Sequence, residues 1–117
     1  MILILSLDAV AAALLGALIE TLGFSVKFAR PPERFEDAIR RVRPKVCLVD
    51  STDPGMTGDG FLGRTAMRGI AVVIFGSAAA LDRVRALALQ HAIDTIVVPP
   101  DTVTLATTLE RAQRKAG

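Results

Sequence analysis

One acidic side chain follows the part of the sequence that looks most like a buried parallel strand. The apolar run 46–49 (Val-Cys-Leu-Val) has the length and composition of such a strand, and Asp50 comes directly after it. Asp53, Pro54 and Gly55 then turn the chain. In open α/β sheets, ligands and reacting groups gather at the carboxyl ends of the strands. Asp50 is therefore the first candidate for a functional carboxylate.

Length and composition limit the kinds of protein this chain can be. With 117 residues, 51% hydrophobic and 22% charged, it is predicted to be one globular domain spanning residues 1–117. The net charge of +2 is too small to argue for nucleic-acid binding. The single cysteine, Cys47, excludes a disulfide framework and a cysteine metal cluster. The uncharged stretch 9–19 is much shorter than the ~20 residues of a membrane span, so we expect a cytoplasmic protein without membrane contact.

Apolar runs of strand length alternate along the chain with longer segments of helical pattern. The predicted strands are 2–7, 25–29, 46–50, 71–75 and 95–98, and the predicted helices are 9–22, 31–42, 58–68, 79–90 and a last one after 99–101. Strands separated by helices require a parallel sheet that is covered on both faces. We therefore predict an α/β fold: a flavodoxin-like, doubly wound five-stranded parallel sheet of order 2-1-3-4-5 with five helices.

The spacing around Asp50 resembles a known signalling family. An Asp with Pro54 four residues on and Gly58 eight residues on resembles the phospho-acceptor strand of receiver domains from bacterial two-component response regulators. The likeness extends over essentially the whole chain and is least secure in the third helix. It implies a phosphorelay protein with Asp50 as the phospho-acceptor position. It also implies a protein partner that is a histidine kinase or resembles a phosphotransfer protein.

The other positions of the family's phosphorylation site carry different residue types in this chain. They are Ser6 and Leu7 for the two Mg²⁺-binding acids, Gly76 (with Ser77 next) for the hydroxyl that binds the phosphoryl group, Val98 for the lysine, Thr95 for the aromatic switch and Pro99 for the proline after the lysine. Leu7 cannot bind a metal, and without Mg²⁺ or lysine the charge of an aspartyl phosphate stays uncompensated. The resemblance therefore predicts a degenerate member, a pseudo-receiver. We expect it to be a protein-interaction module and not an enzyme, without a cofactor.

Two other functions remain open on the sequence. The first is an active receiver, phosphorylated on Asp50 by a histidine kinase, with a rebuilt Mg²⁺ site that uses Asp8, Asp50 and Asp53. Asp8 is also suited to cap the first helix, and Asp50 to accept hydrogen bonds from loop N–H groups. The second is a small flavodoxin-like enzyme or cofactor-binding domain. It is disfavoured because residues 6–9 (Ser-Leu-Asp-Ala) form no glycine-rich phosphate loop.

Two residues beside the candidate site also have two interpretations each. Ser77 either supplies the hydroxyl missing at Gly76 or caps the fourth helix. The peptide bond before Pro99 is either cis or trans.

The first helix carries a row of small residues at helical spacing. The row consists of Ala9, Ala12, Ala13, Gly16 and Ala17, and the expected core face consists of Ala11, Leu14, Leu15, Leu18 and Leu22. A smooth, uncharged outer face predicts a docking surface for a protein partner or for a second copy of the chain. The simpler alternative is that alanine is merely a good helix former. No nucleic acid is expected to bind through this domain.

Overall fold

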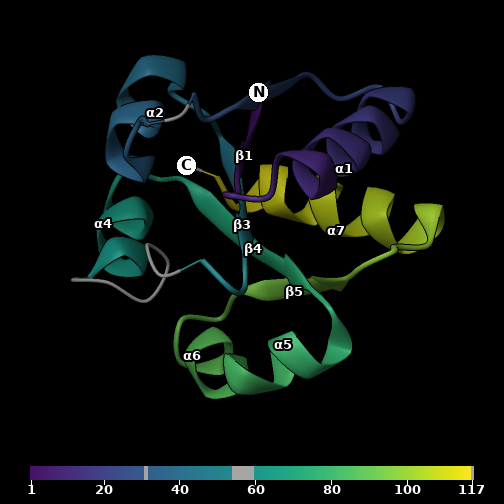
Figure 1. Ribbon diagram of the computed structural model, residues 1–117. Coiled ribbons are helices and arrows are strands. Elements are labelled where there is room, and N and C mark those ends of the chain that lie inside the picture. Colours follow the sequence, from purple (N-terminus) through teal and green to yellow (C-terminus); the bar gives the residue numbers. More distant parts are fainter. Residues whose placement is uncertain (31, 54–59, 117) are drawn as a thin grey trace.

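The computed structural model describes residues 1–30, 32–53 and 60–116, so the predictions made for Pro31, Pro54, Gly55 and Gly58 lie outside the described residues. Five parallel strands form one sheet: β1 (Ile2–Leu5), β2 (Val26–Phe28), β3 (Val46–Asp50), β4 (Ala71–Gly76) and β5 (Asp94–Val97). Their order is β2-β1-β3-β4-β5 (Figure 1). The predicted doubly wound, flavodoxin-like sheet is confirmed.

The described residues form six helices, one more than predicted. They are α1 (Ala9–Thr21), α2 (Phe35–Val42), α4 (Phe61–Met67), α5 (Ala78–Arg83), α6 (Arg85–Gln90) and α7 (Thr102–Lys115). The extra helix arises because the segment predicted as one helix over 79–90 is interrupted at Val84, where φ is −111° and ψ is 8°. Val84 leaves the helical conformation and buries its β-branched side chain in the core. This tertiary packing overrides the local helical pattern.

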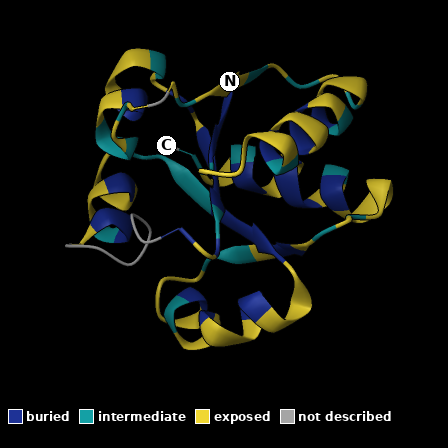
Figure 2. Cartoon of the chain, viewed as in Figure 1, coloured by how far each residue is buried: buried dark blue, intermediate teal, exposed yellow. Residues whose placement is uncertain are grey.

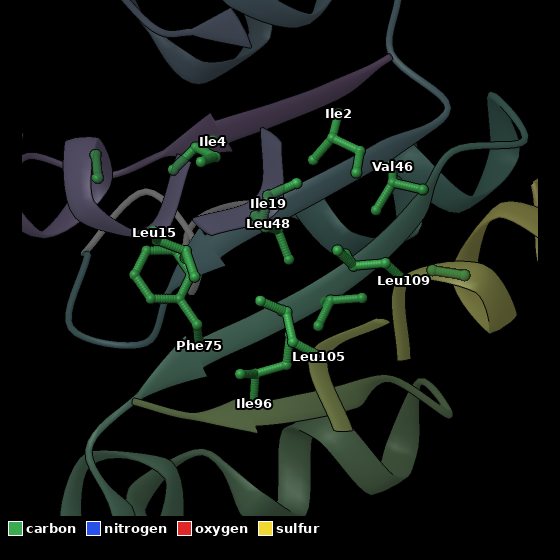
Figure 3. Close-up of a cluster of buried hydrophobic side chains, with 13 residues drawn as sticks. Ile2, Ile4, Leu15, Ile19, Val46, Leu48, Phe75, Ile96, Leu105 and Leu109 are labelled. Atoms are coloured by element: carbon green, nitrogen blue, oxygen red, sulfur yellow. The ribbon is translucent and has the colours of Figure 1, made fainter. Parts of the chain in front are cut away.

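The sheet separates two hydrophobic cores. Ile2 and Ile4 of β1 face the core beneath α1 and α7, whereas Leu3 and Leu5 face the core beneath α2, α4, α5 and α6. This alternation follows from the two-residue period of a strand. Figure 3 shows side chains of the first core, and Figure 2 shows that β1, most of β3 and the second half of β4 are buried. Cys47 lies in the second core, where burial raises the pKa of its thiol to about 12.

Side chains cap the helices that follow β1, β4 and β5. Asp8 accepts hydrogen bonds from the N–H groups of Val10 (3.1 Å) and Ala11 (3.0 Å) at the start of α1, as predicted. Ser77 accepts one from the N–H of Ala80 (3.1 Å) at the start of α5. Asp101 caps α7 in the same way. These caps fix the backbone that follows three of the strands. All three lie at the edge of the sheet that carries Asp50.

One ion pair ties the end of β2 to α2. The guanidinium of Arg41 donates hydrogen bonds to both carboxylate oxygens of Glu33, at 2.8 and 2.9 Å, and to the carbonyl of Phe28 at 3.0 Å. The backbone N–H of Arg30 donates to Glu33 as well, at 2.9 Å. The hydrogen bond from Arg41, helped by that from Arg30, lowers the pKa of Glu33 from 4.5 to about 2.

No helix within the described residues has both the length and the apolar character needed to cross a membrane.

Candidate functional site

Asp50 ends β3 with both carboxylate oxygens engaged. Its Oδ2 accepts a hydrogen bond from the Ser6 hydroxyl at 2.8 Å. Its Oδ1 accepts two from Thr52, one from the N–H at 3.0 Å and one from the hydroxyl at 2.8 Å. These bonds join the residue after β1, the last residue of β3 and the loop after β3. Asp50 is therefore a half-buried, hydrogen-bonded acid and not a free exposed one.

A shallow depression of about 300 Å³ lies beside Asp50 and is lined by Leu7, Asp8, Asp50, Thr52 and Asp53. The three carboxylates named for a rebuilt Mg²⁺ site thus border one hollow. One oxygen of Asp8 is engaged by the cap of α1, and Leu7, which is 78% exposed, stands where the resemblance requires an acid. No group of three or more His, Cys, Asp and Glu side chains is placed to hold a metal ion in the described ranges. This set of donors fits Mg²⁺ poorly, because Mg²⁺ needs near-ideal octahedral oxygen geometry.

Gly76, the last residue of β4, faces the side chain of Ser51. A Cβ built on Gly76 would lie 2.2 Å from the Ser51 Oγ and 3.1 Å from the Ser51 Cβ. Ser51 is 8% exposed, and its Oγ has no hydrogen-bond partner within the described part of the chain. The Ser51 hydroxyl therefore occupies the space in which a side chain at the end of β4 would begin.

Ser51 was not predicted from the sequence as a site residue. A hydroxyl residue directly after Asp50, together with a glycine at the end of the next strand, was the available signal. The two residues are 25 positions apart, and only the pairing of β3 with β4 shows that they meet.

The remaining positions named by the resemblance lie on or after β5. Val98 stands where the lysine is expected, and its N–H donates to the Gly76 carbonyl at 3.0 Å. Its peptide bond to Pro99 is cis. Thr95 is exposed and, with Val97, lines a hollow between β5 and the helices α5 and α6. Thr95 and Val98 are absent from the lining of the depression beside Asp50.

The predicted outer row of α1 is wrong at two of its five positions. Ala12 and Gly16 are buried, and a Cβ on Gly16 would lie 2.6 Å from the ring of Phe28 in β2. Leu14, which was predicted to be core, is 70% exposed. The physical reason is that α1 is apolar on all sides, with Glu20 as its only charged residue. The hydrophobic pattern therefore does not specify which side faces the sheet.

The exposed side of α1 carries large apolar side chains. We call Leu7, Val10, Ala13, Leu14 and Ala17 the α1 face. Ala13 and Ala17 are exposed, and Leu7, Val10 and Leu14 are 78%, 70% and 70% exposed. Figure 2 shows this exposed side of the helix. Leu14 also borders a largely apolar hollow of about 330 Å³ between α1 and the segment after β5, which contains Pro99 and Pro100.

Comparison with known proteins gives a clear fold and no sequence family. No protein-family model matches the sequence, and no curated protein matches it. Among solved structures, a response regulator receiver protein from Burkholderia phymatum superposes with a TM-score of 0.78 at 18% identity, covering 97% of this chain and 94% of that one.

Two further solved structures agree with the first. The receiver domain of NtrX from Brucella abortus has a TM-score of 0.77 at 19% identity and covers 97% of this chain and 98% of that one. The N-terminal signal receiver domain of a two-component response regulator from Bacteroides fragilis has a TM-score of 0.75 at 24% identity, with coverages of 96% and 94%. The chain therefore has the fold of response regulator receiver domains.

Proposed function

We propose that this chain is a receiver-like signalling domain of the response-regulator family that acts as a protein-interaction module without phosphorylation of Asp50. The observation that carries the proposal is the engagement of both Asp50 oxygens by the neutral donors Ser6 and Thr52. Phosphoryl transfer to a carboxylate needs an available oxygen and cations that offset the charge of the transferred group. The side chains that bind Asp50 instead are the uncharged hydroxyls of Ser6 and Thr52.

The residue types at three positions of the family's phosphorylation site support the proposal that Asp50 is not phosphorylated. Ser6 replaces one metal-binding acid and donates a proton to Asp50, which another carboxylate would not do at neutral pH. Leu7 replaces the second acid with an exposed apolar side chain. Val98 replaces the lysine and uses its N–H to bind the end of β4. Each change removes one charge from the site, and together they leave an aspartyl phosphate without a cation.

The α1 face supports interaction with a protein. Monomeric proteins seldom expose a contiguous apolar patch larger than a few hundred Å² unless the patch binds something. Val10 and Leu14, one helical turn apart, are large exposed apolar side chains, as is Leu7 just before the helix, and α1 carries no charged residue before Glu20. We infer that a protein partner with an apolar surface binds here, either a histidine kinase or phosphotransfer-like protein or a second copy of the chain. No catalytic role is proposed for this domain.

Binding of a phosphate mimic tests the proposed state of Asp50. We would record amide NMR spectra during titration with Mg²⁺ alone and then with Mg²⁺ and beryllium fluoride, which mimics an acyl phosphate. The proposal predicts no saturable shift of the Asp50, Ser51 and Thr52 amides in either titration. A saturable, Mg²⁺-dependent shift that disappears in Asp50→Asn would contradict it.

The active receiver with a rebuilt Mg²⁺ site is the second candidate. The observation that favours it is the shared depression lined by Asp8, Asp50 and Asp53. If this candidate is right, Asp8→Asn and Asp53→Asn will each weaken the Mg²⁺-dependent shift. Under the first proposal, there is no shift for these variants to weaken.

A further inference from the structure

Ser51, directly after β3, lies beside Gly76, the last residue of the neighbouring strand β4. The backbone N–H of Ser51 donates to the carbonyl of Phe75 at 2.9 Å, which fixes the Ser51 backbone beside β4. The Ser51 side chain then lies over the bare Cα of Gly76, where an added Cβ would be 2.2 Å from its Oγ. Observed Cβ contacts are essentially never shorter than 3.0 Å, so a side chain at residue 76 and the present position of Ser51 exclude each other.

Backbone conformation does not explain the glycine at residue 76. The φ of Gly76 lies outside the left-handed region that favours glycine, whereas Gly23, Gly60 and Gly69 lie inside it. Gly76 pairs with Val97 as an ordinary strand residue. Glycine within a strand is unfavourable, because it loses more conformational freedom than other residues and has no side chain to pack. The remaining reason for a glycine here is the space that it leaves for Ser51.

Among the described residues, only Ser51 approaches the added Cβ more closely than ordinary van der Waals contact. The other atom near the added Cβ is the Cβ of Ala80, at an ordinary contact distance of 3.6 Å. Removing the Ser51 side chain would therefore make room for a side chain on β4. The Ser51 hydroxyl is also buried without a hydrogen-bond partner among the described residues, which is unfavourable for a polar atom.

We propose that Ser51 and Gly76 form an obligate pair in which Ser51, held on the bare Cα of Gly76, positions the donors of Thr52 on the Asp50 carboxylate. Ser51 lies between Asp50 and Thr52 in the chain, and both hydrogen bonds from Thr52 return to Asp50 across it. Displacing the Ser51 side chain from Gly76 must shift the Thr52 N–H and hydroxyl relative to that carboxylate. The proposal concerns the arrangement of Asp50 and does not depend on whether Asp50 is phosphorylated.

A double-mutant cycle on the full chain tests the pair. Gly76→Ala should lower the melting temperature by roughly 5–15 °C, because the added Cβ would also lie 3.1 Å from the Ser51 Cβ, a close approach that rotation of the Ser51 hydroxyl does not relieve. The same change made together with Ser51→Gly should leave the melting temperature within about 3 °C of the Ser51→Gly single variant. Gly63→Ala in α4 is the matched control, since a Cβ there meets no atom within 4 Å and alanine favours helix. It should not lower the melting temperature.

The second measurement separates positioning from general packing. In ¹⁵N NMR spectra, Gly76→Ala should shift the Thr52 amide, and adding Ser51→Gly should reduce the hydrogen-exchange protection of that amide. Gly63→Ala should change neither. If Gly76→Ala alone does not fold, folding of the double variant is the rescue that the pair predicts. An equal loss of stability in both backgrounds, an unfolded double variant, or an unchanged Thr52 amide would each overturn the proposal.

Discussion

The hydroxyl of Ser6, just after β1, donates a 2.8 Å hydrogen bond to the Asp50 carboxylate at the end of β3. In the family that the chain resembles, the corresponding position carries an acid that binds Mg²⁺. Exchanging that acid for a serine changes the relationship between the two strand ends. Two carboxylates would repel each other unless a cation lay between them, whereas a hydroxyl and a carboxylate attract directly. The strand ends are thus held together by a bond that needs no metal.

Ser6→Ala removes this bond, and we expect it to lower the free energy of unfolding by about 1 kcal/mol. Ser6→Asp should lower it further at neutral pH, because two carboxylates then face each other, and acid or added Mg²⁺ should reverse part of the loss. Urea unfolding at two pH values, with and without Mg²⁺, measures both effects. Equal stability of Ser6→Asp and the wild type at neutral pH without Mg²⁺ would show that the hydrogen bond contributes nothing.

Restoring the family's residues should fail unless Ser51 changes too. Ser6→Asp, Leu7→Asp, Gly76→Thr and Val98→Lys supply the missing groups, but a side chain at residue 76 collides with the Ser51 hydroxyl. We expect the fourfold variant to be poorly folded and, for that reason, unable to bind Mg²⁺. Adding Ser51→Gly should give a folded protein with measurable Mg²⁺ binding by titration calorimetry. Mg²⁺ binding by the fourfold variant with Ser51 intact would show that the loops adapt more easily than the contact implies.

The α1 face should bind a partner through its large apolar side chains. Leu14→Glu places a charge on a side chain that is 70% exposed, so the monomer should keep its stability within about 0.5 kcal/mol. In an interface, the same charge would be buried without a partner and would weaken the complex strongly. Leu89→Glu on α6, where the leucine is 75% exposed, is the matched control.

Sedimentation velocity and recovery of bound proteins on the immobilised domain measure this effect. We expect Leu14→Glu to reduce self-association or partner recovery, and Leu89→Glu to leave both unchanged. If the two variants behave alike, then the exposed leucine on α1 has no special role in binding.

The ion pair between Glu33 and Arg41 should make stability depend on acid pH. The pKa of Glu33 is lowered from 4.5 to about 2 in the folded protein, so between these values the unfolded state binds more protons than the folded one. Stability from this pair is present above pH 4.5 and is lost as the pH falls toward 2. Glu33→Gln should have a shallower decline in unfolding free energy over this range than the wild type. Parallel curves would contradict the assignment.

Much of this architecture could be predicted because the signals are local. The apolar run before Asp50 and the alternation of strands with helices predict the sheet, and Asp8 and Ser77 stand at cap positions that the structure confirms. A strand pattern or a helix cap depends on residues that are only a few positions apart in the sequence. The interruption at Val84 was not predictable in this way, because it depends on burial against another element.

The sequence could not show which side of α1 faces the sheet, and it could not show that Ser51 and Gly76 meet. The two reasons are related. α1 is apolar all round, so no pattern marks Leu14 as exposed or Gly16 as buried against Phe28. Ser51 and Gly76 meet only through the pairing of β3 with β4. Asp50 could be named as a candidate from its place after the apolar run, but the hydrogen bonds that Ser6 and Thr52 donate to it could not.

The most direct test of the proposed function is intact-mass spectrometry after incubation with acetyl phosphate and Mg²⁺. A receiver domain that carries the family's full set of site residues serves as the positive control, and Asp50→Asn serves as the negative control. Because Asp50 is held by Ser6 and Thr52 and no lysine stands at Val98, we expect the mass of this protein to remain unchanged while the positive control gains one phosphoryl group. A phosphoryl adduct that requires Mg²⁺ and is absent from Asp50→Asn would contradict this account.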